Sequence, residues 1–240
     1  MKSLAVMQPY FFPYIGYWQL MHAVDRFVIY DDVNYITRGW INRNRLLING
    51  KPNYITVPLN RASQNKHICE IQMLSSNWRN KILKSIEITY KKSPFYCEVF
   101  PIIDRIIRYK TDSLSDYLRN QLETLASFLS IKTEFRLSSL SHKNNALSGQ
   151  ERILDICKRE GVTTYINLQG GQDLYDIEAF RAADIDLRII VMKPFTYKQR
   201  SIGFTPSLSI IDVLMEVGPV DTKNHLNAVH LISNEKKILQ

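Results

Sequence analysis

This 240-residue chain has little cysteine and no long hydrophobic run. Its three cysteines, Cys69, Cys97 and Cys157, are widely spaced and form neither a CxxC pair nor a zinc-binding pattern, which argues against a disulfide scaffold and favours free thiols in a reducing compartment. No stretch approaches the ~20 apolar residues of a membrane-spanning helix, and Pro9 and Pro13 interrupt the apolar start before a signal-peptide core is complete. We therefore expect a cytoplasmic protein without a membrane span.

The common motifs of nucleotide binding and hydrolysis are also absent. The sequence has no GxGxxG, no P-loop, no GxSxG elbow and no HExxH pair. The five histidines are scattered, so we predict no metal site and leave the cofactor open. Among them His22 lies on an expected helix, where it could be structural or catalytic.

What the sequence does contain is positive charge and tyrosine. The net charge of +8 favours an anionic partner, which could be a phosphate-bearing metabolite, a nucleic acid or an acidic membrane surface, although a solvated basic surface explains it equally well. We expect a small-molecule substrate of negative charge. The 13 tyrosines suit ligand pockets, because each joins an apolar ring to a polar tip. Basic and aromatic residues do not interleave in the lysine-rich segment 81–92, which argues against a nucleic-acid partner. Nothing indicates the oligomeric state.

The first thirty residues predict a strand–helix–strand unit. Ser3–Met7 is an apolar run typical of a buried strand, and the loop 8–13 with its two prolines ends it. Apolar residues at helical spacing predict a helix over 14–24, and 26–30 predicts a second buried strand. This length is that of a βαβ crossover.

The rest of the chain alternates between helices and strands. Asn49-Gly50 predicts a hairpin between 40–48 and 53–59, because both turn positions require positive φ. Further expected elements are helices over 77–91, 95–109, 113–129 (with Asp112 as N-cap), 148–161, 174–183 and 209–216, and strands over 133–137, 163–168 and 187–192. This alternation predicts an α/β fold with a mainly parallel sheet. We expect one domain over 1–240, with a helical insertion or subdomain at 77–129 and a polar, fraying tail at 221–240.

The segment 8–18, QPYFFPYIGYW, is the first candidate site. A strand that runs into a loop at a helix N-terminus is where α/β proteins bind ligands and where phosphate is attracted. Gly16 in the first helical turn permits a close approach of a ligand or of backbone. The alternative is that these aromatic residues form core and that Gly16 serves packing.

The segment 30–45, YDDVNYITRGWINRNR, is the second candidate. Asp31 and Asp32 follow the second strand, where they could bind a metal ion, a ribose hydroxyl or an ammonium group. If 40–48 is a strand, Asn42 and Asn44 share one face and Arg43 and Arg45 the other, so that one pair faces the site and one the solvent. The alternative is a polar edge strand.

Two later segments carry weaker signals. Gln169-Gly170-Gly171 follows a strand and is either a phosphate-binding turn or a simple connection. Ser209 and Asp212 fit the N-terminus of a buried helix, where capping explains them more readily than a role in a site.

Four blocks in this order resemble the WbqC-like proteins: QPYFFPYIGYW, YDDVNY, GWINRNRL with TVPL, and FTPSLSIIDVLMEVGP. The resemblance covers about 4–60 and 163–219 and is loose in the middle helices. Its signature positions are Gln8, Pro9, Pro13, Gly16, Tyr17, Asp31, Val33, Tyr35, Trp40, Asn42, Arg43 and Asn44. It implies a role in bacterial O-antigen or surface-polysaccharide biosynthesis.

The function that this resemblance implies is transfer of an aminoacyl or acyl group to the amine of a nucleotide-linked amino sugar. Under this hypothesis the catalytic candidates are Asp31, Asp32, Tyr17 and His22, with one of the two aspartates as general base. The candidates for substrate binding are Gln8, Tyr10, Tyr14, Gly16, Asn34, Tyr35, Arg38, Trp40, Asn42, Arg43, Asn44 and Arg45.

Two other functions stay open. The start of the chain resembles the first βα unit of nucleotidyltransferases (a HUP-type start) and of pantothenate synthetase, which carry an HxGH-type motif here. Tyr14 and Tyr17 stand where the histidines would be, and tyrosine cannot supply a positive charge at neutral pH, so adenylyl transfer would need a degenerate motif. The third possibility is a non-catalytic sugar-binding protein of the same pathway.

Overall fold

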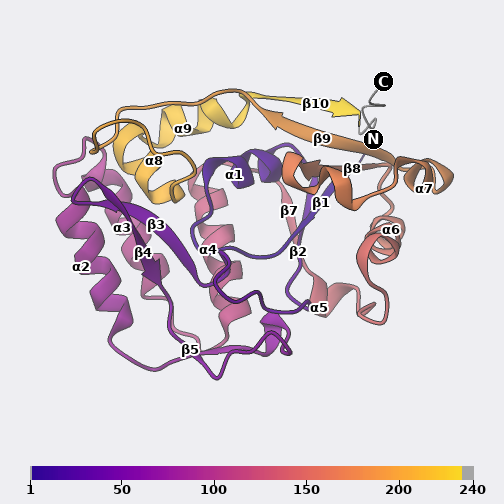
Figure 1. Cartoon of the computed structure of the whole chain (residues 1–240), viewed down its shortest axis with the longest axis horizontal. Helices are drawn as coiled ribbons and strands as arrows, with labels where there is room; N and C mark the ends of the chain where they lie inside the picture. Colours follow the sequence, from indigo (N-terminus) through magenta and orange to yellow (C-terminus); the bar gives the residue numbers. More distant parts are fainter. Residues whose placement is uncertain (1, 234–240) are drawn as a thin grey trace.

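A six-stranded sheet forms the centre of the protein in the computed structural model, which describes residues 2–233. The order is β10-β9-β8-β1-β2-β7, and all neighbours pair in parallel except β10, which is antiparallel to β9 (Figure 1). The strands are β1 (Ser3–Met7), β2 (Arg26–Ile29), β7 (Glu134–Leu137), β8 (Thr164–Leu168), β9 (Asp186–Met192) and β10 (Val229–Ser233). The predicted α/β class with a mainly parallel sheet is confirmed.

The chain reverses its direction of travel across the sheet at β1. From β1 it passes through α1 (Ile15–His22) to β2 and on to β7, and it later returns to the other side of β1 with β8 and β9. The predicted strand–helix–strand start is therefore present, with Leu4 paired to Arg26 and Met7 to Ile29. Ligands of such sheets bind at this switch point, beyond the carboxyl ends of the strands. A specifically nucleotidyltransferase-like start stays a prediction.

Alternating side chains of the strands enter two separate cores. Ala5 of β1 and Phe27 of β2 belong to the larger core, together with α1, α4 (Leu114–Phe128) and α8 (Ile210–Val217). Leu4 of β1 and Val28 of β2 point the opposite way, into a smaller core with α6 (Gly149–Glu160) and α7 (Ile177–Ala182). The sheet is thus covered on both faces, as expected for parallel strands.

The three middle helices lie where the sequence predicts them. They are α2 (Trp78–Tyr90), α3 (Tyr96–Ile107) and α4, and their apolar sides join the larger core on the left of Figure 1. The expected N-cap of α4 was wrong by one residue, because Ser113 rather than Asp112 accepts the backbone N–H of Asp116, at 3.3 Å. Whether 77–129 is a separate insertion stays a prediction.

The hairpin at Asn49-Gly50 is also present. Its strands are β3 (Arg43–Ile48) and β4 (Lys51–Thr56), and the turn residues have φ angles of 53° and 72°. The second strand ends at Thr56, earlier than predicted, and a short pair follows, β5 (Leu59–Asn60) with β6 (Gln72–Met73). Between them lies the 3-10 helix η1 (Ile68–Glu70).

Two expectations for the second half were wrong in part. The helix predicted over 174–183 is present as α7 but begins later than predicted, because Asp176 caps it by accepting the N–H of Glu178. Leu174 instead ends a separate 3-10 helix, η2 (Gln169–Leu174). The tail does not fray up to Ser233, since it forms α9 (Pro219–Leu226) and β10. The polar composition of this segment predicts fraying, but Thr222 and Leu226 are buried and β10 pairs along β9. Residues 234–240 of the expected tail lie outside the described residues.

Two smaller points complete the fold. The short helix α5 (Ser138–Ser141) follows β7. Cys69, Cys97 and Cys157 are all free, and burial raises the pKa of Cys69 to about 11 and of Cys157 to about 12. In the part of the chain that the structure describes, no helix is both long and apolar enough to cross a bilayer.

Candidate functional site

A continuous groove lies at the switch point of the sheet. It consists of three adjoining cavities of about 580, 430 and 250 Å³, and we call it the edge groove. The first two cavities share Gln8, Tyr30 and Tyr175, and the second and third share Tyr10, Tyr14 and Trp40. Gln8 follows β1, Tyr30 follows β2 and Gly170 follows β8, so the groove lies beyond the carboxyl ends of the central strands.

The loop between β1 and α1 forms one wall of this groove and is held in a strained conformation. Phe12 is fully buried with a φ of +42°, a left-handed conformation that costs a non-glycine residue of the order of 1–3 kcal/mol. The side chain of Gln121 in α4 accepts the backbone N–H of Phe12 at 3.1 Å. The backbone carbonyl of Phe12 accepts from Asn44 at 2.8 Å and from Ser209 at 2.9 Å. Three distant elements therefore fix this loop.

The loop between β1 and α1 presents a set of unpaired polar groups to the groove. Within residues 2–233, the side chains of Gln8, Tyr10 and Tyr14 have no hydrogen-bond partner. Burial raises the pKa of both Tyr10 and Tyr14, so these phenols stay neutral near pH 7 and act as donors and acceptors rather than bases. Such groups suit the hydroxyls of a sugar.

Gly16 is placed where a side chain would collide with the groove wall. A Cβ there would lie 2.2 Å from Sδ of Met192 and 2.5 Å from the ring of Tyr14. Gly16 itself is buried and does not line the groove, so its role is to let the Tyr14 ring pack closely over α1.

The two neighbouring aspartates have different environments. Asp31 is fully buried, and its carboxyl group accepts from Ser115 Oγ at 2.6 Å, Ser139 Oγ at 2.9 Å and Ser139 N at 3.0 Å. These contacts tie the end of β2 to α4 and α5. Asp31 does not line the groove, whereas Asp32 does.

Among the described residues, Asp32 has a partner for one of its two carboxyl oxygens. Oδ2 forms an ion pair with Arg152 at 2.6 Å, and Arg152 also donates to the carbonyl of Asp32 at 3.2 Å and to Asn144 at 2.9 Å. Asp32 lines the 580 Å³ cavity, and its Oδ1 is buried without a hydrogen-bond partner among residues 2–233. An unsatisfied buried acceptor costs about 1–3 kcal/mol, so this oxygen favours the arrival of a donor.

The same cavity includes the N-terminus of α6. Ser148 and Gly149 line it, and the Ser148 side chain does not cap the helix. Free N–H groups and the helix dipole at such an end attract anions. Asn34 and His67 also line this cavity.

The polar residues of 35–45 serve mainly the protein itself. Asn42 accepts from Tyr35 at 2.8 Å and donates to Val57, and Asn44 donates to the carbonyls of Phe11 and Phe12. The asparagines therefore face inward, and of the predicted residues in this segment Trp40 and Asn44 line the groove.

The predicted arginines lie outside the groove. Arg43 stacks on Tyr54 at 4.3 Å and donates to the carbonyls of Gly39 and Arg38. Arg45 lies over the Trp40 ring at 5.4 Å, and Arg38 is exposed. None of the three lines a described cavity, so the structure does not bring them to the groove where the sequence predicts a role in substrate binding.

The other two predicted catalytic residues are separated from the groove. Tyr17 is fully buried and donates to the carbonyl of Gln8 at 2.9 Å, and burial raises its pKa well above the ordinary value. His22 lies at the far end of α1, where its ring contacts Asn227 at 3.2 Å. Tyr17 thus supports the groove from beneath, and the structure does not bring His22 to it.

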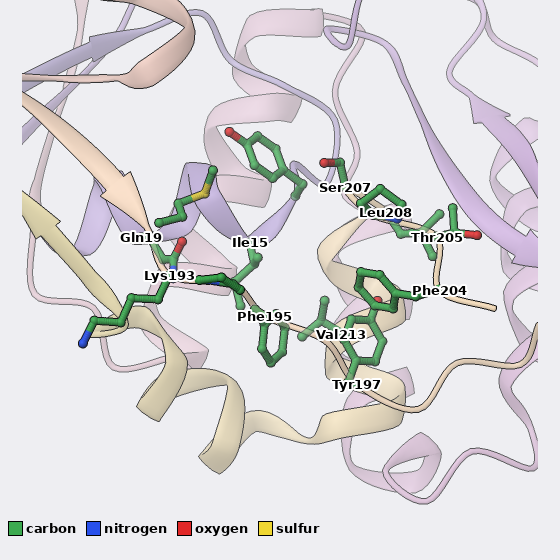
Figure 2. Close-up of a pocket in the computed structure, with 14 residues that line it drawn as sticks. Ile15, Gln19, Lys193, Phe195, Tyr197, Phe204, Thr205, Ser207, Leu208 and Val213 are labelled. Carbon is green, nitrogen blue, oxygen red and sulfur yellow. The ribbon is translucent and has the colours of Figure 1, made fainter.

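Sequence reasoning missed a second pocket, which we call the aromatic pocket. It has a volume of about 270 Å³ and lies between α1 and the segment 193–208, next to Tyr14 and Ser207 of the edge groove (Figure 2). The available signal was the density of aromatic residues and prolines between β9 and α8. It was overlooked because the segment has no helical or strand periodicity.

Asp212 also has a role that its position in the first turn of α8 does not reveal. It is almost fully buried and accepts from the hydroxyls of Tyr90 and Tyr197, each at 2.6 Å. Tyr197 lines the aromatic pocket, so the carboxyl group lies directly behind that wall. Burial raises the pKa of Asp212, and the two hydroxyl donors only partly oppose this.

This shift predicts how stability depends on pH. Because the folded pKa lies above the unfolded value of 3.8, Asp212 contributes stability that is fully present below 3.8 and is lost as pH rises through the folded pKa. The free energy of unfolding of wild type minus that of Asp212→Asn is therefore expected to fall as pH rises from about 4. Urea unfolding across a pH series measures it, with the exposed Asp184→Asn as control. A difference that is constant or rises with pH would contradict the prediction.

No group of three or more His, Cys, Asp or Glu side chains within residues 2–233 is arranged to hold a metal ion. The polar groups of the edge groove are instead single oxygens, amides and a helix terminus, which are suited to hydroxyls, amines and phosphate.

Comparison with known proteins identifies the family. The model of the WbqC-like protein family matches residues 8–224, which include α1, all groove residues after β1, the aromatic pocket and α8. The chain is also 29% identical over 221 residues to the uncharacterized protein Rv1507c of Mycobacterium tuberculosis, covering 91% of this chain and 95% of that protein. No solved structure matches. Since the family model spans most of the chain, the protein belongs to the WbqC-like family.

Proposed function

We propose that the protein is a transferase of surface-polysaccharide (O-antigen) biosynthesis in the cytoplasm, which adds an acyl or aminoacyl group to the amine of a nucleotide-linked amino sugar. Family membership supports the general setting through the resemblance described above. The single observation that carries the reaction is the enclosed, unpartnered Oδ1 of Asp32 at the wall of the edge groove.

The chemistry follows from the two oxygens of this carboxyl group. Arg152 binds Oδ2 and fixes the orientation, which leaves Oδ1 to accept an N–H of the sugar amine. The amine nitrogen forms a bond to the carbonyl carbon of an activated acyl ester or thioester. The bond from that carbon to its leaving group breaks, and Oδ1 takes the proton that the nitrogen loses.

The surroundings of Asp32 suit the remainder of such a substrate. The N-terminus of α6 offers free N–H groups to the diphosphate, close to the acidic residue that holds the amine. Gln8, Tyr10 and Tyr14 offer unpaired amide and hydroxyl groups to sugar hydroxyls. The net charge of +8 favours the approach of an anion.

The test is an assay with the full chain, nucleotide-linked amino sugars and a panel of activated acyl and aminoacyl donors, read by mass spectrometry. We expect a product heavier by one acyl group, and a loss of at least 100-fold in its rate of formation with Asp32→Asn. This change keeps the shape and one acceptor for Arg152, but it leaves that buried guanidinium without a counter-charge, which costs about 3–5 kcal/mol. The rate is therefore compared at a temperature at which urea unfolding shows that the variant is folded. Asp184→Asn serves as the matched control on an exposed aspartate. An unchanged rate with Asp32→Asn, or unmodified amino sugar with every donor, would overturn the proposal.

The strand order of the sheet also fits a second candidate function, which the experiment must distinguish from acyl transfer. A doubly wound sheet with a ligand groove at its switch point is also the setting of nucleotide chemistry. A nucleotidyl transferase with a degenerate motif would be stabilised by nucleoside triphosphates with Mg²⁺ and would release pyrophosphate. A non-catalytic sugar-binding protein would bind the amino sugar and yield neither product.

A further inference from the structure

The aromatic pocket is lined mainly by apolar and aromatic side chains. Figure 2 shows the rings of Phe195, Tyr197 and Phe204 gathered along one side, with Ile15 and Val213 nearby. Pockets of this composition bind apolar or aromatic parts of ligands, and flat rings gain most from offset or edge contacts with other rings. The pocket is therefore suited to one compact ring system.

One buried polar atom lies at its wall without a partner. Gln19 is almost fully buried, and its Nε2 donates to the carbonyl of His225 at 2.8 Å, which fixes the orientation of the amide. Its Oε1 is enclosed and has no hydrogen-bond partner among the described residues. An unmet buried acceptor costs about 1–3 kcal/mol, so a ligand that carries an N–H donor is favoured over a hydrocarbon.

The pocket can hold a neutral or dipolar ring, but among the described residues it presents no cationic group that would bind a phosphate within it. Lys193 is the charged residue that lines it, and this side chain is exposed and directs its amino group away from the rings (Figure 2). Asp212 lies behind Tyr197, which donates a hydrogen bond to it. Diphosphate groups should therefore bind elsewhere, in the edge groove.

The aromatic pocket and Asp32 lie at opposite ends of a series of adjoining cavities. Tyr14 and Ser207 line both the aromatic pocket and the edge groove, so the two cavities adjoin. Met192 at the end of β9 lines the aromatic pocket, and Asp32 follows β2, three strand spacings away. At about 4.8 Å per spacing this is about 14 Å across the sheet, a span that a nucleoside diphosphate sugar can bridge and a free sugar cannot.

We infer that the aromatic pocket is the subsite for the nucleobase of the nucleotide-linked substrate. The base packs against the ring of Phe204 and donates an N–H to Oε1 of Gln19, while the diphosphate and sugar extend along the edge groove towards Asp32. This assignment rests on the proposed function, since it requires a nucleotide-linked ligand. It adds where the base lies and which residues select it.

The test compares Phe204→Ala with Ile202→Ala in the same segment. Phe204 is 41% exposed, so its replacement should not unfold the protein, and Ile202 is fully exposed and does not line the pocket. Calorimetry with the full chain measures Kd for UDP, ADP, GDP and dTDP, for UDP-N-acetylglucosamine, and for N-acetylglucosamine 1-phosphate, which lacks a base. Since base–aromatic stacking contributes about 1–3 kcal/mol, we expect Phe204→Ala to raise the Kd of the preferred nucleotide by about 5-fold to 150-fold. Ile202→Ala and Phe204→Tyr should leave it within twofold.

The outcomes separate this inference from the proposed function. If nucleotides bind and Phe204→Ala does not weaken them, the base lies elsewhere and the inference is overturned, while acyl transfer at Asp32 stands. If Phe204→Ala weakens N-acetylglucosamine 1-phosphate equally, or if an acyl thioester competes with nucleotides in the wild type, the pocket holds a sugar or an acyl group and the inference is again overturned. Loss of acyl transfer with Asp32→Asn while Phe204→Ala raises nucleotide Kd supports both. If no nucleotide or nucleotide sugar binds, both are overturned.

Discussion

Replacing Asp31 by alanine is expected to lower the free energy of unfolding by about 3–5 kcal/mol. The carboxyl group of Asp31 is fully buried and accepts three hydrogen bonds, from Ser115 Oγ, Ser139 Oγ and Ser139 N. Hydrogen bonds to a charged acceptor are stronger than neutral ones, and alanine would leave the buried Ser115 hydroxyl and the two partly buried Ser139 donors without this acceptor. The end of β2 would lose its attachment to both α4 and α5.

Urea unfolding measures this effect, since the midpoint should shift while the slope stays the same. Asp173→Ala is the matched control, because Asp173 is exposed, has no positive φ, and its side chain bonds to no described residue. Asp31→Asn should cost less, since it keeps one acceptor oxygen. A loss below 1 kcal/mol for Asp31→Ala would show that the three donors find other partners. Asp32→Asn should lose activity at least 100-fold even where the variant is folded, whereas Asp31→Ala should act through stability, and this contrast separates the catalytic from the structural aspartate.

Replacing Asn44 by alanine is expected to cost about 2–4 kcal/mol of stability and also to weaken ligand binding. The Asn44 amide donates to the carbonyls of Phe11 and Phe12 and accepts from the N–H of Arg45. It is one of three clamps on the left-handed Phe12, so its loss lets this residue relax towards a less strained conformation. Tyr10 and Tyr14, on either side of that residue, would then lose their position in the groove.

Two measurements test this prediction together. Urea unfolding gives the stability, and the Kd for UDP-N-acetylglucosamine, measured at a temperature where the variant is folded, gives the second effect. Asn60→Ala is the control, because Asn60 is exposed and its side chain makes no hydrogen bond within residues 2–233. If stability falls and affinity does not, the clamp supports the fold alone and the loop keeps its shape without it.

Local patterns were sufficient for most elements of the fold. The apolar run Ser3–Met7, the helical spacing of α2–α4 and the Asn49-Gly50 turn depend on side-chain period and on φ preferences, which neighbouring residues define. The segment 221–233 was misjudged because β10 exists through pairing with β9, a contact that no local pattern encodes.

The sequence by itself determined the α/β class, the family and the neighbourhood of the edge groove, because these follow from the order of strands and from the residues at their ends. Only the tertiary structure decided which residues near the edge groove line it and which stabilise the fold. Asp31 and Asp32 are adjacent in the chain, yet alternate side-chain directions send one into a network with α4 and α5 and the other to the groove wall with Arg152. It also decided that Asn44 clamps a strained loop and that 193–208 forms a pocket with α1, because these contacts join residues far apart in the sequence.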